Sequence, residues 1–268
     1  ILIEFSHILT FSMLFIAAIF DLRSEMGDVP DEFGAIAIVG GIILHAVYSY
    51  SIESFTPLIY CIAVGTVLSA YGWLAYWKGM WGGADALGLS ALGFGAPFLT
   101  FSMEGVITQT FSLFANIVLI ATLYTLGFSL VRAYRTENFR EKLKDKFQSE
   151  RKRIALELGL ATVVFAFLKP FLAALFYIVI AASVLLLRFL RVVEDYAMTE
   201  EVEAEELEGG EVVRENKSDK IKGVTEEEIE EIEDSVEVMH GIRFMPVFPA
   251  ALILTNTGFS IVGILIGL

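Results

Sequence analysis

Long apolar runs alternate with short polar segments along most of this chain. A helix that crosses a bilayer needs about 20 mainly apolar residues, and polar groups concentrate in the connections between such helices. The pattern therefore predicts a polytopic membrane protein folded as an all-α helical bundle. The predicted membrane segments lie near residues 3–20, 33–50, 57–77, 85–101, 106–131 and 246–268.

One further apolar stretch, residues 154–190, is interrupted by Lys169-Pro170. Proline breaks or kinks a helix, so the stretch is either one long kinked helix or a tight hairpin of two. Basic residues flank both ends, which favours the hairpin because both ends then lie on one side of the membrane. The sequence thus predicts six to eight transmembrane segments, with eight favoured.

The basic residues also predict the orientation. The segment 132–153 holds nine Lys and Arg against four acids, and loops of this kind stay in the cytoplasm. Counting back places the N-terminus outside, and the outer loops this predicts, 51–56 and 102–105, hold no Lys or Arg. The expected parts are a membrane core (1–133), a basic cytoplasmic amphipathic loop (134–153), a membrane hairpin (154–193), an acidic cytoplasmic insert (194–243) and a final transmembrane helix (244–268).

Composition supports the membrane assignment. Hydrophobic residues make up 56% of the 268 residues, and the mean hydropathy is +0.66. These values exclude an ordinary soluble globule and a disordered chain. One cysteine and three scattered histidines exclude a disulfide framework and a zinc cluster, so we expect no metal and no cofactor. Lipid is an expected partner, nucleic acid is not, and the oligomeric state is left open.

The net charge of −14 is concentrated in one segment, because residues 194–240 hold 19 acids and 4 bases. Glutamate runs around sparse Ile and Val predict a partly helical or disordered insert. Such an insert is either a solvated linker or a surface that attracts basic ligands, an effect that salt weakens.

Two aspartates lie at the edges of predicted spans. Asp21 ends the first span, and Asp85 opens the fourth, directly after Gly82-Gly83-Ala84. Two complete crossings separate them, so both belong on the cytoplasmic face. Two neighbouring carboxylates share a proton, and one can then activate water while the other polarises a carbonyl. The alternatives are structural: Asp21 as the polar edge of a helix and Asp85 as a helix cap.

Three stretches resemble one family. Lys78-Gly79-Met80-Trp81-Gly82-Gly83-Ala84-Asp85, with Ala91-Leu92-Gly93 and Pro97, resembles the GxGD region of type IV prepilin peptidases and archaeal preflagellin peptidases. Asp21, followed by Val29-Pro30-Asp31, is similar to the family's first catalytic aspartate region. Pro246-Val247-Phe248-Pro249 is similar to its C-terminal P-x-x-P stretch. The chain differs in having Ala84 for the second glycine and Leu87 where many members carry lysine.

The resemblance implies a membrane-embedded aspartyl endopeptidase that removes short basic class III signal peptides from prepilin-like or preflagellin-like substrates at the cytoplasmic face. It implies catalysis by Asp21 and Asp85 and no cofactor. Because the chain lacks the cysteine-bearing domain of the bacterial enzymes, we expect no methyltransferase activity. Substrate-binding roles are implied for Gly82, Gly83, Ala84, Pro246 and Pro249. The alternatives are a presenilin-like intramembrane protease and a non-enzymatic transport or assembly protein.

Overall fold

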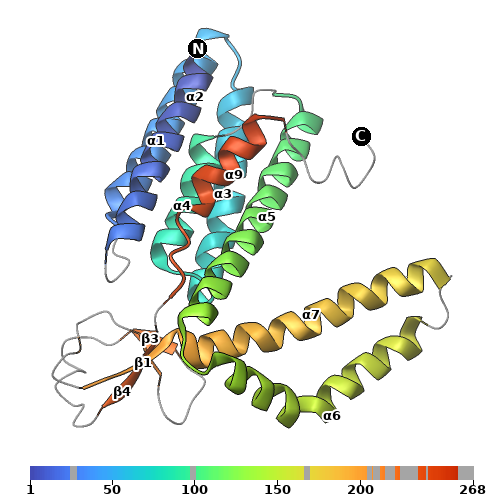
Figure 1. The fold of residues 1–268 in the computed structure, drawn as a ribbon. Helices are drawn as coiled ribbons and strands as arrows, with labels where there is room; N and C mark the ends of the chain where they lie inside the picture. Colours follow the sequence, from blue (N-terminus) through green and yellow to red (C-terminus); the bar gives the residue numbers. More distant parts are fainter. Residues whose placement is uncertain are drawn as a thin grey trace. The chain divides into compact units, whose positions relative to one another are not determined.

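The chain forms two compact units in the computed structural model (Figure 1). One comprises Ile1–Thr125 and Ile242–Leu268, and the other Leu126–Gly241. The structure describes residues 1–24, 29–96, 101–165, 170–203, 207, 212–214, 221–223, 235–239 and 241–258.

The first unit is a bundle of apolar helices. Four described helices are long and apolar enough to cross a membrane, which is consistent with the prediction of a helical membrane protein: α1 (Leu2–Arg23), α2 (Asp31–Ser51), α3 (Thr56–Trp77) and α5 (Met103–Arg135). Two shorter helices, α4 (Gly83–Gly95) and α9 (Val247–Asn256), complete the described part of the bundle.

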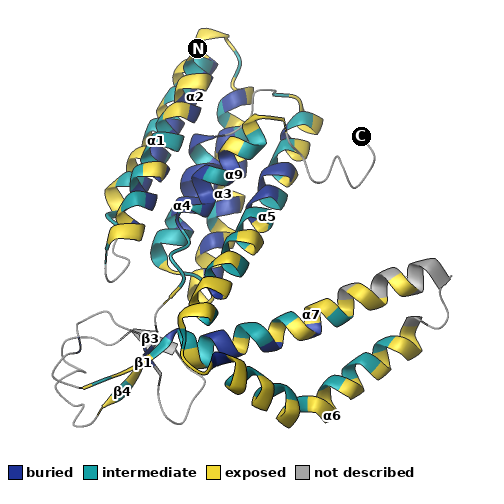
Figure 2. Cartoon of the chain, in the orientation of Figure 1, coloured by how far each residue is buried: buried dark blue, intermediate teal, exposed yellow. Residues whose placement is uncertain are grey.

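Helix α4 is the most enclosed element of this unit, and it packs against α1, α2, α3 and α9. Most of its residues from Ala86 onward are buried, and Figure 2 colours them dark blue. Small residues make this packing possible, since a Cβ on Gly93 would lie 2.9 Å from the Cα of Gly65. The 13 residues of α4 extend about 20 Å, so the helix ends earlier than the predicted segment 85–101. Pro97 lies outside the described residues.

The outward faces of the long helices carry large exposed apolar side chains, such as Phe15, Ile43, Ile59 and Leu123. A soluble protein rarely exposes so many, whereas a bilayer solvates them. The buried core instead holds Leu14, Leu92 and Phe248 with many small residues. This distribution is typical of helices that pack through small residues and face lipid with large ones.

The second unit contains the predicted hairpin region. Helix α6 (Phe139–Phe165) and helix α7 (Pro170–Ala197) are separate helices that pack against each other. Ion pairs join Arg188 to Glu150 and Glu157, and Lys146 to Asp195. Because these pairs connect the start of one helix to the end of the other, the helices run antiparallel. Helix α6 also merges the basic segment 134–153 and the first hairpin arm into one continuous helix from Phe139.

The acidic insert contains a small antiparallel sheet of order β1-β4-β2-β3. Its strands are β1 (Thr199–Val202), β2 (Val212–Arg214), β3 (Ile221–Gly223) and β4 (Val236–Met239). The prediction of a partly helical or disordered insert is therefore wrong for these residues, and the fold is not purely helical. The cause is the alternation of valine with polar residues, since β-branched residues at a period of two favour strands. Val213 and Val238 pack with Leu207 on one face.

Candidate active site

Asp21 lies in the last turn of α1, and its side chain is turned into the bundle. Its neighbours Phe20 and Leu22 are exposed, whereas Asp21 is only 6% exposed. The carboxylate Oδ2 accepts a hydrogen bond of 3.1 Å from the backbone N–H of Met245. This bond ties the end of α1 to the segment that leads into α9.

Asp85 is the third residue of α4 and lies half-buried in its first turn. Its Oδ2 accepts a hydrogen bond of 3.1 Å from the backbone N–H of Gly82, the N-cap residue. This is the reciprocal half of a capping box, and the positive end of the helix dipole favours a carboxylate at this position. Asp85 therefore has a structural role at its helix terminus, which a catalytic role does not exclude.

Asp21 at the end of α1 and Asp85 at the start of α4 lie at the same end of the bundle, because α1 ends and α4 begins there (Figure 1). The two helices pack against each other, and the negative charge of Asp21 acts on Asp85. Like charges at such a position favour the sharing of one proton. The arrangement has the groups required for acid–base chemistry on a peptide bond.

Two residues that the sequence analysis did not identify complete the surroundings of Asp21. The guanidinium of Arg243 donates a hydrogen bond to the carbonyl of Leu22, and its charge acts on Asp21. Tyr124 of α5 lies near both charges. One signal was available: Arg243 is the sole Lys or Arg after Lys222, and it lies three residues before Pro246.

An aromatic cluster joins the segment before α4 to the segment before α9. The ring of Trp81 lies 6.0 Å from that of Phe244 and 6.3 Å from that of Phe248, measured between centroids. Tyr71 of α3 packs edge-on against the same tryptophan at 5.8 Å. These contacts hold the backbone that carries Asp85 beside the backbone that binds Asp21.

The glycines before Asp85 have room around them. A Cβ on Gly82 would lie 3.5 Å from Asp85 Oδ2, and one on Gly83 would lie 3.8 Å from Tyr76 Cε2. Both are ordinary van der Waals distances, so packing within the chain does not require glycine at either position. Ala84, in contrast, packs against the apolar core.

The two prolines of the C-terminal motif shape the start of α9. Pro246 is the N-cap and Pro249 the third helical residue, where a backbone N–H has no partner within the helix. Pro249 is buried and Pro246 half-buried. Of the pair, Pro246 is thus the more accessible to a bound peptide, whereas Pro249 fixes the helix.

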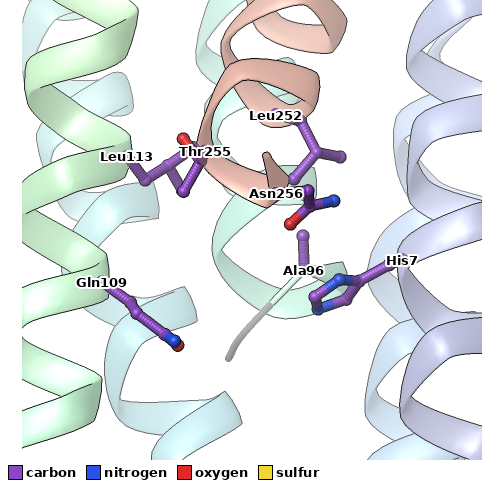
Figure 3. A pocket seen from close by; sticks show the side chains of 7 residues that line it. All are labelled: His7, Ala96, Gln109, Leu113, Leu252, Thr255 and Asn256. Atoms are coloured by element: carbon purple, nitrogen blue, oxygen red, sulfur yellow. The ribbon is translucent and has the colours of Figure 1, made fainter. Parts of the chain in front are cut away.

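A small cavity of about 50 Å³ lies between α1, α5 and α9 (Figure 3), and neither aspartate lines it. Its lining mixes polar and apolar side chains, namely His7, Ala96, Gln109, Leu113, Leu252, Thr255 and Asn256. Thr255 also accepts a hydrogen bond of 3.0 Å from Asn116 Nδ2. In the part of the chain that the structure describes, no three His, Cys, Asp or Glu side chains are grouped to hold a metal ion.

Comparison with protein-family models, with curated proteins and with solved structures finds no match for this chain. The residues of the site are therefore the basis for any functional conclusion. Those residues are two carboxylates, one arginine, one tyrosine and the backbone donors of Gly82 and Met245, gathered at one end of an apolar helical bundle.

Proposed function

We propose that this protein is a membrane-embedded aspartyl endopeptidase of the prepilin and preflagellin peptidase type. The observation that carries the proposal is that Asp21 and Asp85 lie at the same end of a bundle of apolar helices, on two helices that pack against each other, with the charge of Asp21 acting on Asp85. Polar and charged residues at membrane helices are costly and tend to mark function. Two carboxylates at the same end of the bundle form a pair that can carry out acid–base catalysis.

The proposed reaction is hydrolysis of one peptide bond. One ionised carboxylate removes a proton from water, and the resulting hydroxide adds to the scissile carbonyl. The protonated carboxyl donates a hydrogen bond to the carbonyl oxygen. Collapse of the resulting tetrahedral oxyanion breaks the C–N bond, and the leaving amine takes up a proton from the pair. Water is the sole co-reactant, so the site needs neither a metal nor a nucleophilic side chain.

The site also suggests the kind of substrate. Packing within the chain does not require glycine at positions 82 and 83. The absence of side chains there leaves room for an extended peptide beside Asp85. Pro246 borders the same region at the start of α9. A substrate with a short basic leader and an apolar helix matches this site, since its helix enters the bilayer and its scissile bond lies at the membrane surface. We place that surface on the cytoplasmic side of a multi-pass cell-membrane protein.

The proposal is tested by cleavage in lipid nanodiscs. The purified protein is incubated with prepilin-like and preflagellin-like substrates, and the products are identified by mass spectrometry. We expect one cut between the basic leader and the apolar helix. Asp85→Asn should abolish it, whereas Glu104→Gln, which neutralises an exposed carboxylate at the start of α5, should not. Absence of cleavage by the wild type across the panel would contradict the proposal.

A transport function is the second candidate, because the polar side chains of His7, Gln109 and Asn256 line a cavity inside the apolar bundle. Transporters bind their solutes at polar sites between membrane helices. The cavity volume of about 50 Å³ suits a few water molecules better than a larger solute. The aspartate pair therefore supports hydrolysis more strongly than the cavity supports transport.

A further inference from the structure

We propose that Arg243 is a positioning residue that keeps Asp21 as the ionised member of the pair. Asp21 is then the base that activates water, and Asp85 is the acid that protonates the leaving amine. This assignment rests on the proposed function and extends it, because neither the motifs nor the proximity of the carboxylates distinguishes their roles.

Arg243 and Met245 act on Asp21 from one short segment. The Arg243 guanidinium binds the carbonyl of Leu22, the residue after Asp21, and its positive charge acts on the carboxylate. Two residues later, the Met245 N–H donates directly to Asp21 Oδ2 at 3.1 Å. A buried carboxylate stays ionised only if it gains opposite charge and hydrogen-bond donors, and this segment supplies both.

Asp85 has different surroundings. Its backbone donor is Gly82, from the start of its own helix, and the charge that acts on it is the negative charge of Asp21. An ionised Asp21 disfavours a second negative charge nearby, so the shared proton belongs on Asp85. A protonated Asp85 can donate a hydrogen bond to the carbonyl oxygen and then transfer its proton to the leaving nitrogen.

The other ionisable groups on the elements around α1 fit this assignment. Helix α5 contributes Tyr124, which is neutral at ordinary working pH because a phenol ionises near pH 10. Helix α2 begins with Asp31 and Glu32, both exposed to solvent. Helix α4 contributes Asp85. Arg243, from the segment before α9, is the cation that acts on Asp21.

The decisive measurement is the pH dependence of kcat/KM for wild type, Arg243→Gln, Arg243→Lys and Arg23→Gln. In Arg243→Gln, Asp21 loses the nearby positive charge and is harder to ionise. The acidic limb of the kcat/KM profile should therefore move to higher pH by about one unit. Cleavage at low pH should fall about tenfold and recover as the pH rises. Arg243→Lys keeps the charge and should keep the limb near its wild-type position. Arg23→Gln removes an exposed charge from the same helix end and should leave the profile unchanged.

Infrared titration of the carboxyl groups provides a second readout that needs no cleavage. The band assigned to Asp21, identified by its loss in Asp21→Asn, should protonate at higher pH in Arg243→Gln than in wild type. If wild type cleaves no substrate, the proposed function fails, and this titration still decides the role of Arg243. The inference would be overturned if folded Arg243→Gln kept the wild-type acidic limb of the pH profile or the wild-type titration of Asp21. It would also be overturned if Arg243→Lys and Arg243→Gln shifted the acidic limb equally.

Discussion

At the scale of single residues, the site depends on what compensates each buried polar group. Asp21 is 6% exposed, and burying an unpaired charge costs several kcal/mol. The Met245 N–H and the Arg243 charge offset part of that cost. Gly82 and Gly83 differ from the tightly packed glycines of the bundle, because a Cβ on either would meet its nearest neighbour at an ordinary van der Waals distance.

This contrast predicts opposite effects for two Gly→Ala substitutions. Gly83→Ala should fold normally, because its Cβ meets Tyr76 at an ordinary 3.8 Å, yet it should slow cleavage about tenfold by narrowing the path to Asp85. Gly95→Ala should destabilise the bundle by about 1–3 kcal/mol, since its Cβ would collide with the Thr10 hydroxyl. Thermal unfolding and cleavage assays on both variants separate these effects. Unimpaired cleavage by Gly83→Ala would contradict the proposed substrate path.

The two aspartates were predictable from sequence, and the residues around them were not. Asp21 and Asp85 are each at the boundary of an apolar run, and counting crossings places them on one face. Arg243 follows Asp21 by 222 positions, and no spacing rule connects them. Tyr124 is one of many aromatic residues in apolar segments. Their proximity to Asp21 follows from helix packing, which the pattern of apolar residues does not specify.

At the scale of elements, the α6–α7 hairpin is held by a cluster of charges around a buried arginine. Arg188 has a side chain only 5% exposed, and it lies 2.7 Å from Glu157 and 3.3 Å from Glu150. Removing one partner of such a cluster leaves the remaining charges without compensation. The cluster therefore fixes how the two helices pair.

We expect Arg188→Met to loosen the hairpin, because Glu150 and Glu157 would then repel each other. Hydrogen exchange and limited proteolysis within 139–197 should accelerate about tenfold, with residues 1–125 unaffected. Arg191→Met, which removes an exposed arginine from the same helix, is the matched control. Adding Glu150→Gln and Glu157→Gln to Arg188→Met should restore protection. Equal exchange in Arg188→Met and wild type would show that the cluster does not hold the hairpin.

Sequence patterns predicted the long helices better than the short elements. Apolar runs located α1, α2, α3 and α5 because each is long enough to produce a clear signal. Helix α4 ends at Gly95 although apolar residues continue beyond it, so hydropathy alone overestimates its length. The strands were not predicted because glutamate runs dominate the insert. The alternation that is typical of strands, as in Val236-Glu237-Val238, spans only a few residues.

At the scale of the whole molecule, charge is divided unevenly. Residues 194–240 of the acidic insert hold 19 acids and 4 bases, a net charge of −15, and the rest of the chain sums to +1. If the insert attracts basic leaders, it should raise the rate of substrate encounter without changing the chemistry. The alternative is a solvated segment with no effect on binding.

The register between β1 and β4 shows where residues of the insert can be deleted without breaking this strand pair. Val202 pairs directly with Val236, so an Asn-Gly turn can replace residues 203–235 and keep the β1–β4 ladder. This removes 14 acids and 4 bases. At low ionic strength, KM for a basic-leader substrate should rise about threefold to tenfold with kcat unchanged, and the difference should vanish near 1 M salt. A neutral-leader substrate is the control, and an unchanged KM would favour the solvated-linker interpretation.

The central claim is that Asp21 and Asp85 act together as one catalytic unit. The most direct test compares cleavage by wild type, Asp21→Asn, Asp85→Asn and the double variant, with folding checked by thermal unfolding. Residues that act as a unit are not additive, so each single change should reduce kcat by about a thousandfold or more and the double change should cost little beyond that. A folded single variant that keeps more than about a tenth of wild-type kcat would contradict the account, because that aspartate would then be a structural cap.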